Sequence, residues 1–245
     1  MAVLQTALNW TATTDNIELK ASVIIVCGGS SSRMNGIDKI FAKIGNMPVA
    51  AKTIMAFEAL KEISNIVVVT KEESVLPMQK LCDEYGFKKV TDIVAGGACR
   101  EESVYNGFKM LSSEEQIVLI HDGARPFVTS EVILRVLASA KAYSAATCAV
   151  NVKDTVKVVK PDGLIVSTPD RSTLRAVQTP QGFTYSVFKN AIEAAKDLSV
   201  FTDDCSLIEA FGYPVYTVEG DYNNIKITTT DDLGFANYLV TKEGK

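Results

Sequence analysis

Short apolar runs rich in β-branched residues alternate with segments of helical periodicity over most of the chain. The runs lie at residues 23–26, 66–69, 90–95, 117–121 and 146–150, and the helical segments at 48–60, 74–85, 101–111 and 130–143. Continuous apolar strands separated by amphipathic helices are typical of a parallel sheet covered by helices on both faces. The alternation therefore predicts a doubly wound α/β fold with a mostly parallel sheet, in which ligands bind at the carboxyl ends of the strands.

The alternation is interrupted at residues 152–177, where charged and polar residues flank the turn Pro161-Asp162-Gly163. This pattern predicts two strands that project as a β-hairpin arm, with too few apolar residues for a core of their own. Because a lone hairpin is only marginally stable, we expect the arm to pack on a partner subunit in a dimer. Beyond it, the pattern predicts helices at 185–196, 203–211 and 231–240 and a strand at 214–220.

Composition disfavours several classes of protein. The 245 residues carry a net charge of −4 and contain no block of Lys and Arg, so the chain lacks the electrostatic footprint of a duplex nucleic acid binder. No apolar stretch is long enough to predict a membrane span. The length fits a single domain at residues 21–245, preceded by an N-terminal extension at residues 1–20 without the features of a signal peptide.

The cysteine and histidine content narrows the chemistry. The 5 cysteines are widely spaced and form no CxxC pair, which argues against a disulfide framework and a zinc site and favours a cytoplasmic location. His121 is the only histidine, so a mechanism that needs two histidines is excluded. Because His121 lies in an apolar strand, we interpret it as a packed core residue rather than a catalytic base.

The first predicted strand ends in a loop of small residues, GGSSSRM, at residues 28–34. Small residues let backbone N–H groups converge on phosphate oxygens, and Arg33 and Lys39 add two cations nearby. The loop matches neither GxGxxG nor the P-loop pattern. A phosphate-binding loop and a surface turn with solvated cations are therefore both open interpretations.

Another candidate site follows the strand at 117–121, in the segment HDGARPF. Asp122 and Arg125 would bring a carboxylate and a guanidinium to the carboxyl edge of the sheet, where a metal ion and an anionic group could meet them. The alternative is a salt bridge between the two residues that caps the strand.

The segment GGACREESV places Gly96 and Gly97 between a strand and a helix, with Ser103 in the first turn of that helix. Backbone groups at such a turn can recognise the edge of a nucleobase, although a plain turn with a helix N-cap is the alternative. Further along, Lys226 precedes an Asp-rich helix start in NNIKITTTDDL.

The order and spacing of these segments resemble those of the 2-C-methyl-D-erythritol 4-phosphate cytidylyltransferases, enzymes of non-mevalonate isoprenoid synthesis. The resemblance is carried by GGSSSRM, GGACREESV, HDGARPF, DTVK, DRSTLRAVQTPQGF, TDDCSLIE and NIKITTTDDL. It implies a Rossmann-like nucleotidyltransferase fold, CTP and a polyol phosphate as substrates, Mg²⁺ as cofactor, and a homodimer joined by the arm.

The resemblance also implies roles for individual residues. Those matched to catalytic positions at the reacting phosphate are Arg33, Lys39 and Lys226. Those matched to CTP-binding positions are Cys27, Gly28, Gly29, Ser30, Ser31 and Ser32 at the triphosphate and Gly97, Ala98 and Ser103 at the cytosine. Those matched to acceptor-binding positions are Asp122, Arg125 and Thr179, together with Thr155 and Arg171 from the arm of the neighbouring subunit. Asp122 is also a candidate metal ligand.

The chain departs from the family pattern at four points. Ser31 stands at the second loop glycine of the family, Cys27 is the small residue before the loop, and Asp38 stands where a proline often precedes the lysine. The segment from Arg33 to Lys39 is also one residue shorter than in some members. We expect these departures to affect the geometry of the loop and the rate of the reaction more than the type of reaction. Two alternatives stay open: a ribitol-5-phosphate cytidylyltransferase, which is similar over the same motifs, and a nucleotide-binding protein without catalysis. A Rossmann dehydrogenase is disfavoured because GxGxxG is absent.

Overall fold

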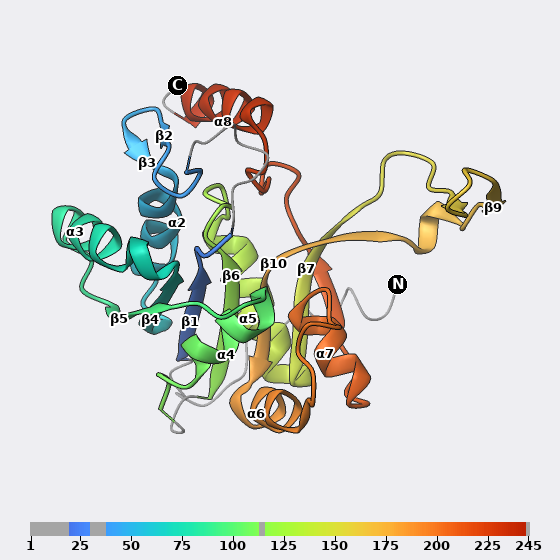
Figure 1. The fold of residues 1–245 in the computed structure, drawn as a ribbon, viewed down its shortest axis with the longest axis horizontal. Coiled ribbons are helices and arrows are strands. Elements are labelled where there is room, and N and C mark those ends of the chain that lie inside the picture. The colour runs from blue at the N-terminus through green and yellow to red at the C-terminus, as the bar shows by residue number, and fades with distance from the viewer. Residues whose placement is uncertain (1–19, 30–37, 113–115, 244–245) are drawn as a thin grey trace, which may run out of the picture.

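A computed structural model of the chain describes residues 20–29, 38–112 and 116–243. Its centre is a seven-stranded sheet with the order β11-β7-β10-β6-β1-β4-β5 (Figure 1). Strand β10 runs antiparallel to β6 and β7, and the other neighbouring pairs are parallel, so the prediction of a mostly parallel sheet is confirmed. The strands are β1 (Ala21–Val26), β4 (Ile63–Thr70), β5 (Val90–Ala95), β6 (Ile117–Asp122), β7 (Ala145–Asn151), β10 (Arg175–Thr184) and β11 (Tyr216–Glu219).

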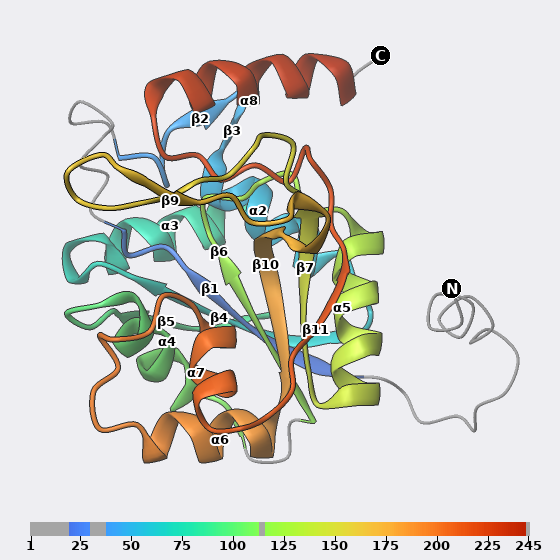
Figure 2. The ribbon, with the colours of Figure 1, turned by 90° about the vertical axis from the view of Figure 1, so that its right-hand side faces the viewer.

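Helices cover both faces of this sheet (Figures 1 and 2). The described helices are α2 (Val49–Glu58), α3 (Val75–Tyr85), α4 (Arg100–Phe108), α5 (Ser130–Tyr143), α6 (Tyr185–Ala194), α7 (Asp204–Ala210) and α8 (Thr230–Glu243), with short 3₁₀ turns η1 (Glu72–Ser74) and η2 (Arg171–Thr173). Of these, as Figure 1 shows, α8 lies beyond the end of the sheet, next to β2 (Lys43–Ile44) and β3 (Met47–Pro48). Within the described residues, none of the helices is both long and apolar enough to cross a membrane.

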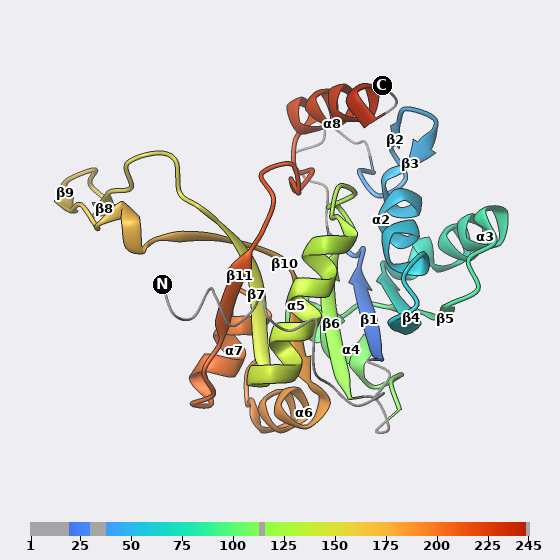
Figure 3. The ribbon, with the colours of Figure 1, turned by 180° about the vertical axis from the view of Figure 1, so that it is seen from behind.

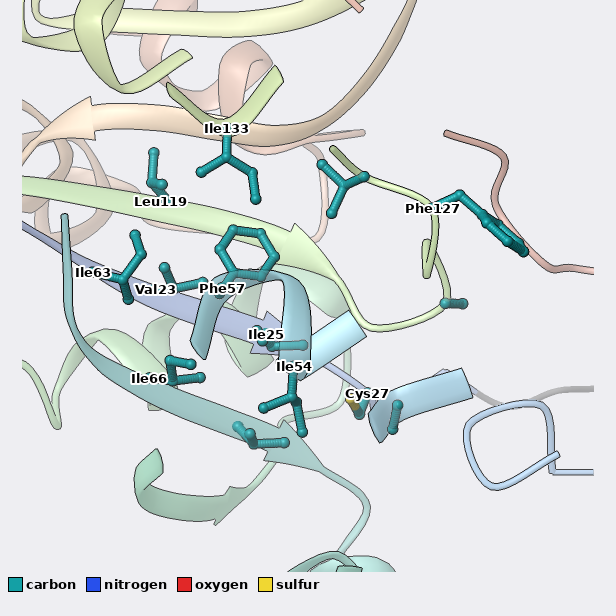
Figure 4. Close-up of a cluster of buried hydrophobic side chains, with 14 of the residues drawn as sticks. Val23, Ile25, Cys27, Ile54, Phe57, Ile63, Ile66, Leu119, Phe127 and Ile133 are labelled. Atoms are coloured by element: carbon teal, nitrogen blue, oxygen red, sulfur yellow. The ribbon is translucent and has the colours of Figure 1, made fainter. Parts of the chain in front are cut away.

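The burial of both faces of β1 explains why residues 23–26 are all apolar. Val23 and Ile25 pack on one face in a cluster with Phe57 of α2, which Figure 4 shows, whereas Ile24 packs on the other face with Phe108 of α4. Side chains alternate across a strand, so a strand covered on both faces needs apolar residues at every position. The carboxyl ends of these strands form the edge at which α/β proteins commonly bind ligands.

A short hairpin before α2 was not predicted from the sequence. It consists of β2 (Lys43–Ile44) and β3 (Met47–Pro48), which are too short to give a periodic signal. Gly45 in its turn has a positive φ of 57°, and its N–H donates a hydrogen bond to Asn237 Oδ1 of α8 at 2.9 Å. The hairpin therefore supports the C-terminal helix.

The arm projects sideways from the sheet, between β7 and β10 (Figures 1 and 3). It carries the two-stranded hairpin β8 (Val158–Val159) and β9 (Ile165–Ser167). At the predicted turn, Gly163 has a φ of 89° and its N–H donates to Lys160 O at 2.9 Å. The paired strands are shorter than expected, and residues 175–177 already belong to β10, where they pair with β7 in the main sheet.

Candidate active site

A cavity of about 510 Å³ lies at the carboxyl ends of β1, β4, β5 and β6. Gly28 and Gly29 line it directly after β1, Lys71 lines it after β4, and Asp122 ends β6. The turn between β5 and α4 adds residues 97–100. This is the edge of the sheet at which α/β proteins bind their ligands.

The cavity brings together residues that are far apart in the sequence and that the motifs singled out. Those that line it are Gly28, Gly29, Lys39, Gly97, Ala98, Ser103, Asp122 and Lys226. Those that the structure describes but places outside the lining are Cys27, Arg125, Thr155, Arg171 and Thr179. Those outside the described residues are Ser30, Ser31, Ser32 and Arg33.

Asp122 is the electrostatic centre of one side of the cavity. Its Oδ2 lies 3.0 Å from Lys226 Nζ and 3.3 Å from Arg125 Nε, and its Oδ1 lies 3.6 Å from Arg100 Nε. Burial on its own would raise the pKa of this carboxyl, but Lys226, Arg100 and Arg125 outweigh burial and hold the pKa well below its usual range. Asp122 is therefore ionised and surrounded by cations at neutral pH.

Arg125 contributes to this side mainly by holding the segment that carries Lys226. Its Nη1 donates to Asn224 O at 2.8 Å, two residues before the lysine. The N–H of Ile227 donates to Ala124 O at 2.9 Å, which ties the same segment to the end of β6. The alternative of an Asp122–Arg125 salt bridge is thus present in the structure, and Lys226 shares that carboxylate.

His121 is fully buried and has hydrogen-bond partners at both ring nitrogens. Its Nε2 lies 3.2 Å from Arg125 O and its Nδ1 lies 3.0 Å from Thr179 Oγ1, which in turn accepts from the N–H of Asp122 at 3.0 Å. This pattern is satisfied by a neutral ring protonated on Nε2, and burial lowers the pKa of His121 to about 4. The prediction of a packed histidine is confirmed, and Thr179 links it to Asp122.

The turn between β5 and α4 is held by side chains of its own helix. Ser103 Oγ accepts from the N–H of Gly97 at 3.0 Å and donates to Cys99 O at 2.9 Å. Glu102 Oε2 accepts from the N–H of Ala98 at 2.7 Å. The helix N-cap is Cys99, whose Sγ accepts from the N–H of Glu102 at 3.4 Å. The turn is thus fixed in shape where it faces the cavity.

Sequence reasoning missed an ion pair between Arg100, which lines the cavity, and the buried Asp204 of α7. Arg100 Nη2 lies 2.8 Å from Asp204 Oδ2, while Arg100 Nε faces Asp122. The start of α7 that carries Asp204 is fixed by Gln181 of β10, whose Nε2 donates to Asp203 Oδ2 at 2.7 Å. The motifs GGACREESV and TDDCSLIE contain both partners of the pair, but nothing in their sequences indicates that the two meet.

Cys27 and the arm residues lie away from the cavity for different reasons. The Cys27 side chain is buried beneath it, where desolvation raises the pKa of the thiol well above its usual range. A Cβ on Gly123 would lie 2.3 Å from Cys27 Sγ, so the glycine leaves room for the sulfur. Thr155 and Arg171 are exposed in the arm, where Arg171 Nη1 donates to Lys153 O at 2.6 Å.

The chain matches known proteins over nearly all of its length. The family model described as 2-C-methyl-D-erythritol 4-phosphate cytidylyltransferase matches residues 21–242. A protein of that name from Bacillus cereus (strain ATCC 10987 / NRS 248) is 45% identical over 226 residues, which cover 91% of this chain and 99% of that protein. One from Clostridium botulinum (strain Langeland / NCTC 10281 / Type F) is 43% identical over 225 residues, which cover 91% of this chain and 98% of that protein.

A solved structure agrees with the sequence comparisons. The crystal structure of 4-diphosphocytidyl-2C-methyl-D-erythritol synthase from Anaerococcus prevotii DSM 20548 is similar with a TM-score of 0.81 and 30% identity, covering 93% of this chain and 100% of that chain. The fold, the motifs and these comparisons all indicate the same enzyme family. The chain belongs to the 2-C-methyl-D-erythritol 4-phosphate cytidylyltransferase family.

Proposed function

We propose that this enzyme transfers CMP from CTP to 2-C-methyl-D-erythritol 4-phosphate, giving 4-diphosphocytidyl-2-C-methyl-D-erythritol and pyrophosphate. The observation that carries the proposal is that one cavity is lined both by Gly28, Gly29 and Lys39 and by the ion pair of Asp122 and Lys226. Membership of the family supports it, and the names of the relatives favour methylerythritol phosphate over ribitol phosphate as acceptor.

The reaction needs no protein base. A phosphate monoester has a second pKa near 6, so the acceptor phosphate is largely dianionic at neutral pH and attacks the α-phosphorus of CTP directly. One P–O bond forms as the bond to the β-phosphate breaks, and pyrophosphate leaves. His121 is consistent with this scheme, because both of its ring nitrogens are engaged inside the protein.

The protein would act on this reaction by positioning and by electrostatics. Lys39 and Lys226, together with Arg33 outside the described residues, would neutralise charge that develops at the α-phosphate. Gly28 and Gly29 would let backbone N–H groups approach the triphosphate. Asp122 would orient Lys226, whose Nζ it holds at 3.0 Å, and would offer a carboxylate to the hydroxyls of the acceptor.

Cytosine selection would lie at the turn between β5 and α4. Gly97 and Ala98 line the cavity there, and hydrogen bonds from their N–H groups to Ser103 and Glu102 fix the turn. Those N–H groups are engaged within the turn, so the base would be recognised by the other polar groups of the turn. A base with a mismatched donor and acceptor pattern would leave those groups unpaired. This supports a strong preference for CTP.

The residues fit a Mg²⁺ ion that arrives with the nucleotide. Asp122 is the one carboxylate among the described residues that line the cavity, and three cations already surround it. Mg²⁺ is commonly held by substrate phosphates and one or two carboxylates, so Asp122 would supply at most one ligand. When bound, the ion would neutralise charge on the phosphates.

The arm supports a homodimer. Its tip exposes large apolar side chains, with 57% of Leu164, 55% of Ile165 and 56% of Val166 accessible. An apolar hairpin that stands away from its own core gains stability by packing on another surface, and a second copy would be related by a two-fold axis. In such a dimer, Thr155 and Arg171 would complete the acceptor site of the partner.

The state of the cysteines supports a cytosolic location. All five cysteines, Cys27, Cys82, Cys99, Cys148 and Cys205, are unpaired. Unpaired thiols are usual in a reducing compartment.

Pyrophosphate release tests the proposed function. We expect release from CTP with 2-C-methyl-D-erythritol 4-phosphate, and a rate lower by roughly 10²-fold or more with ATP or GTP. Ribitol 5-phosphate serves as the control acceptor, and we expect it to react slowly. Comparable rates with ATP would refute cytidylyl transfer, preference for ribitol 5-phosphate would favour that alternative, and binding of CTP without release would favour a non-catalytic nucleotide-binding protein.

A further inference from the structure

The cations that line the cavity differ in their partners. Arg100 is paired with Asp204 at 2.8 Å, and Lys226 is paired with Asp122 at 3.0 Å. Lys71 also lines the cavity and is half-buried. Within the described part of the chain, its ammonium group has neither an ion-pair nor a hydrogen-bond partner.

Lys71 lies between two glycine-containing segments of the site. It follows Thr70, the last residue of β4, whose carbonyl accepts from the N–H of Gly96 at 2.8 Å. On the other side, a Cβ on Gly28 would lie 3.9 Å from the carbonyl carbon of Thr70. Since β4 lies between β1 and β5 in the sheet, Lys71 stands between the loop proposed for the triphosphate and the turn proposed for the cytosine.

Glu72 and Glu73 follow Lys71 directly, but both are exposed, and within the described residues neither forms an ion pair with Lys71. Asp122, the carboxylate of the described lining, is already shared by three cations. An ammonium that faces a cavity with other cations is repelled by them, and an anionic ligand removes this repulsion.

We infer that Lys71 binds a phosphate group of the nucleotide and thereby adds a cation to the site from β4. Lysine suits this role because its ammonium is a compact point charge that donates to phosphate oxygens. The inference rests on the proposed function, since CTP supplies the phosphates. Lys71 binds the nucleotide before and during the reaction alike, so its contribution falls on affinity rather than on turnover.

Calorimetric titration of CTP into wild type and Lys71→Gln tests this inference without turnover, because no acceptor is present. We expect the Kd for CTP to rise about tenfold in Lys71→Gln, the scale of one hydrogen bond to a charged group. Cytidine, which lacks phosphate, should bind both proteins equally in a competition titration. With acceptor added, KM for CTP should rise similarly and kcat should stay within about twofold.

Two further variants serve as controls. Lys71→Arg keeps the positive charge and should recover most of the affinity for CTP. Lys80→Gln removes the same charge from an exposed position on α3 and should leave the Kd for CTP unchanged. Circular dichroism of each variant verifies that it is folded.

The outcomes separate this inference from the proposed function. If wild type does not bind CTP, both fail. If wild type binds CTP and Lys71→Gln binds it equally well, only the inference about Lys71 fails. An equal loss of affinity for CTP and cytidine would assign Lys71 to the ribose or base and would also overturn the assignment to phosphate.

Discussion

The two halves of the cavity are built by different means. The half around Asp122, with Arg100 and Lys226, is a network of ion pairs supported by buried hydrogen bonds. The half around the glycine-rich loop and the turn between β5 and α4 is shaped by backbone, with Lys39 and Lys71 as its cations. We call them the acceptor half, which comprises Arg100, Asp122 and Lys226, and the nucleotide half, which comprises Gly28, Gly29, Lys39, Lys71, Gly97 and Ala98.

This difference suggests how one site can accept two anions. In the acceptor half, the ion pairs form before any ligand arrives, so the geometry is set in advance. In the nucleotide half, Lys71 has no partner within the described residues, so positive charge remains for the phosphates. Substitutions in the acceptor half should therefore damage both fold and catalysis, whereas substitutions in the nucleotide half should affect mainly the reaction.

The largest expected effect is that of Asp122→Asn. Removal of the charge leaves Arg100, Arg125 and Lys226 facing one another without an anion. We expect kcat/KM to fall by roughly 10³-fold. The free energy of unfolding should fall by about 3 kcal/mol, as when one partner of a buried ion pair is lost. Denaturant unfolding and steady-state kinetics measure the two quantities, and an unchanged stability would break the contrast between the halves.

The same variant has a pH signature. The pKa of Asp122 is depressed in the folded state, so its stabilising effect is complete above the unfolded pKa of about 3.8 and is lost as pH falls through the lower, folded value. The stability gap between wild type and Asp122→Asn should therefore be constant from pH 7 to about pH 5 and should narrow below pH 4. A gap that widens on acidification would contradict the assignment of Asp122 as an ionised centre.

Lys39→Ala tests the nucleotide half. We expect kcat to fall by roughly 10²-fold, the scale of losing one preorganised electrostatic contact in the transition state. The unfolding free energy should change by less than about 1 kcal/mol, as is usual for lysines near solvent. Lys43→Ala, an exposed lysine on β2, is the matched control and should retain wild-type kcat. A near-normal kcat in Lys39→Ala would favour the alternative interpretation, in which Lys39 is a solvated cation without a role in catalysis.

Mixed dimers test whether the acceptor half is completed by a second chain. Lys39→Ala and Arg171→Ala should each be nearly inactive as homodimers. Random reassortment makes about half of the dimers mixed, and each mixed dimer then has one intact site of two, so activity should recover to about a quarter of wild type. If Arg171 served its own chain, every site would keep one lesion, and verified mixed dimers would show no recovery.

The smallest expected effect is that of Thr179→Val. The hydroxyl bridges His121 Nδ1 and the N–H of Asp122, and its loss leaves buried polar groups unpaired. We expect a loss of about 1–2 kcal/mol in unfolding free energy and a severalfold lower kcat. Thr179→Ser, which keeps the hydroxyl, should restore both. Equal damage in the two variants would point to packing instead of hydrogen bonding.

Much of this architecture could be predicted from the sequence because its signals are local. The apolar runs gave the strands, the interruption gave the arm, and His121 within an apolar strand indicated a buried ring. The residues on strand ends were also accessible to reasoning, since parallel strands share one carboxyl edge. Gly28, Gly97 and Asp122 meet there as expected.

The missed features depend on pairs of residues that are distant in sequence. Arg100 and Asp204 are 104 residues apart, and periodicity predicts the helices that carry them but not which side chains face each other. Arg125 was expected to meet an anionic group or to pair with Asp122, whereas it also donates to Asn224 O, 99 residues away. Lys71 follows an ordinary strand end, and only the sheet order shows that it stands between the two glycine-containing segments.

A crystal structure with CTP bound would test the central claim most directly, because the claim assigns each half of the cavity to one substrate. The account predicts the triphosphate at Gly28 and Gly29 with Lys71 Nζ in contact with a phosphate oxygen, and the cytosine at Gly97 and Ala98. The ion pair of Asp122 and Lys226 should be left facing an open acceptor site. A triphosphate bound between Asp122 and Arg100, or a cytosine outside the turn between β5 and α4, would contradict it.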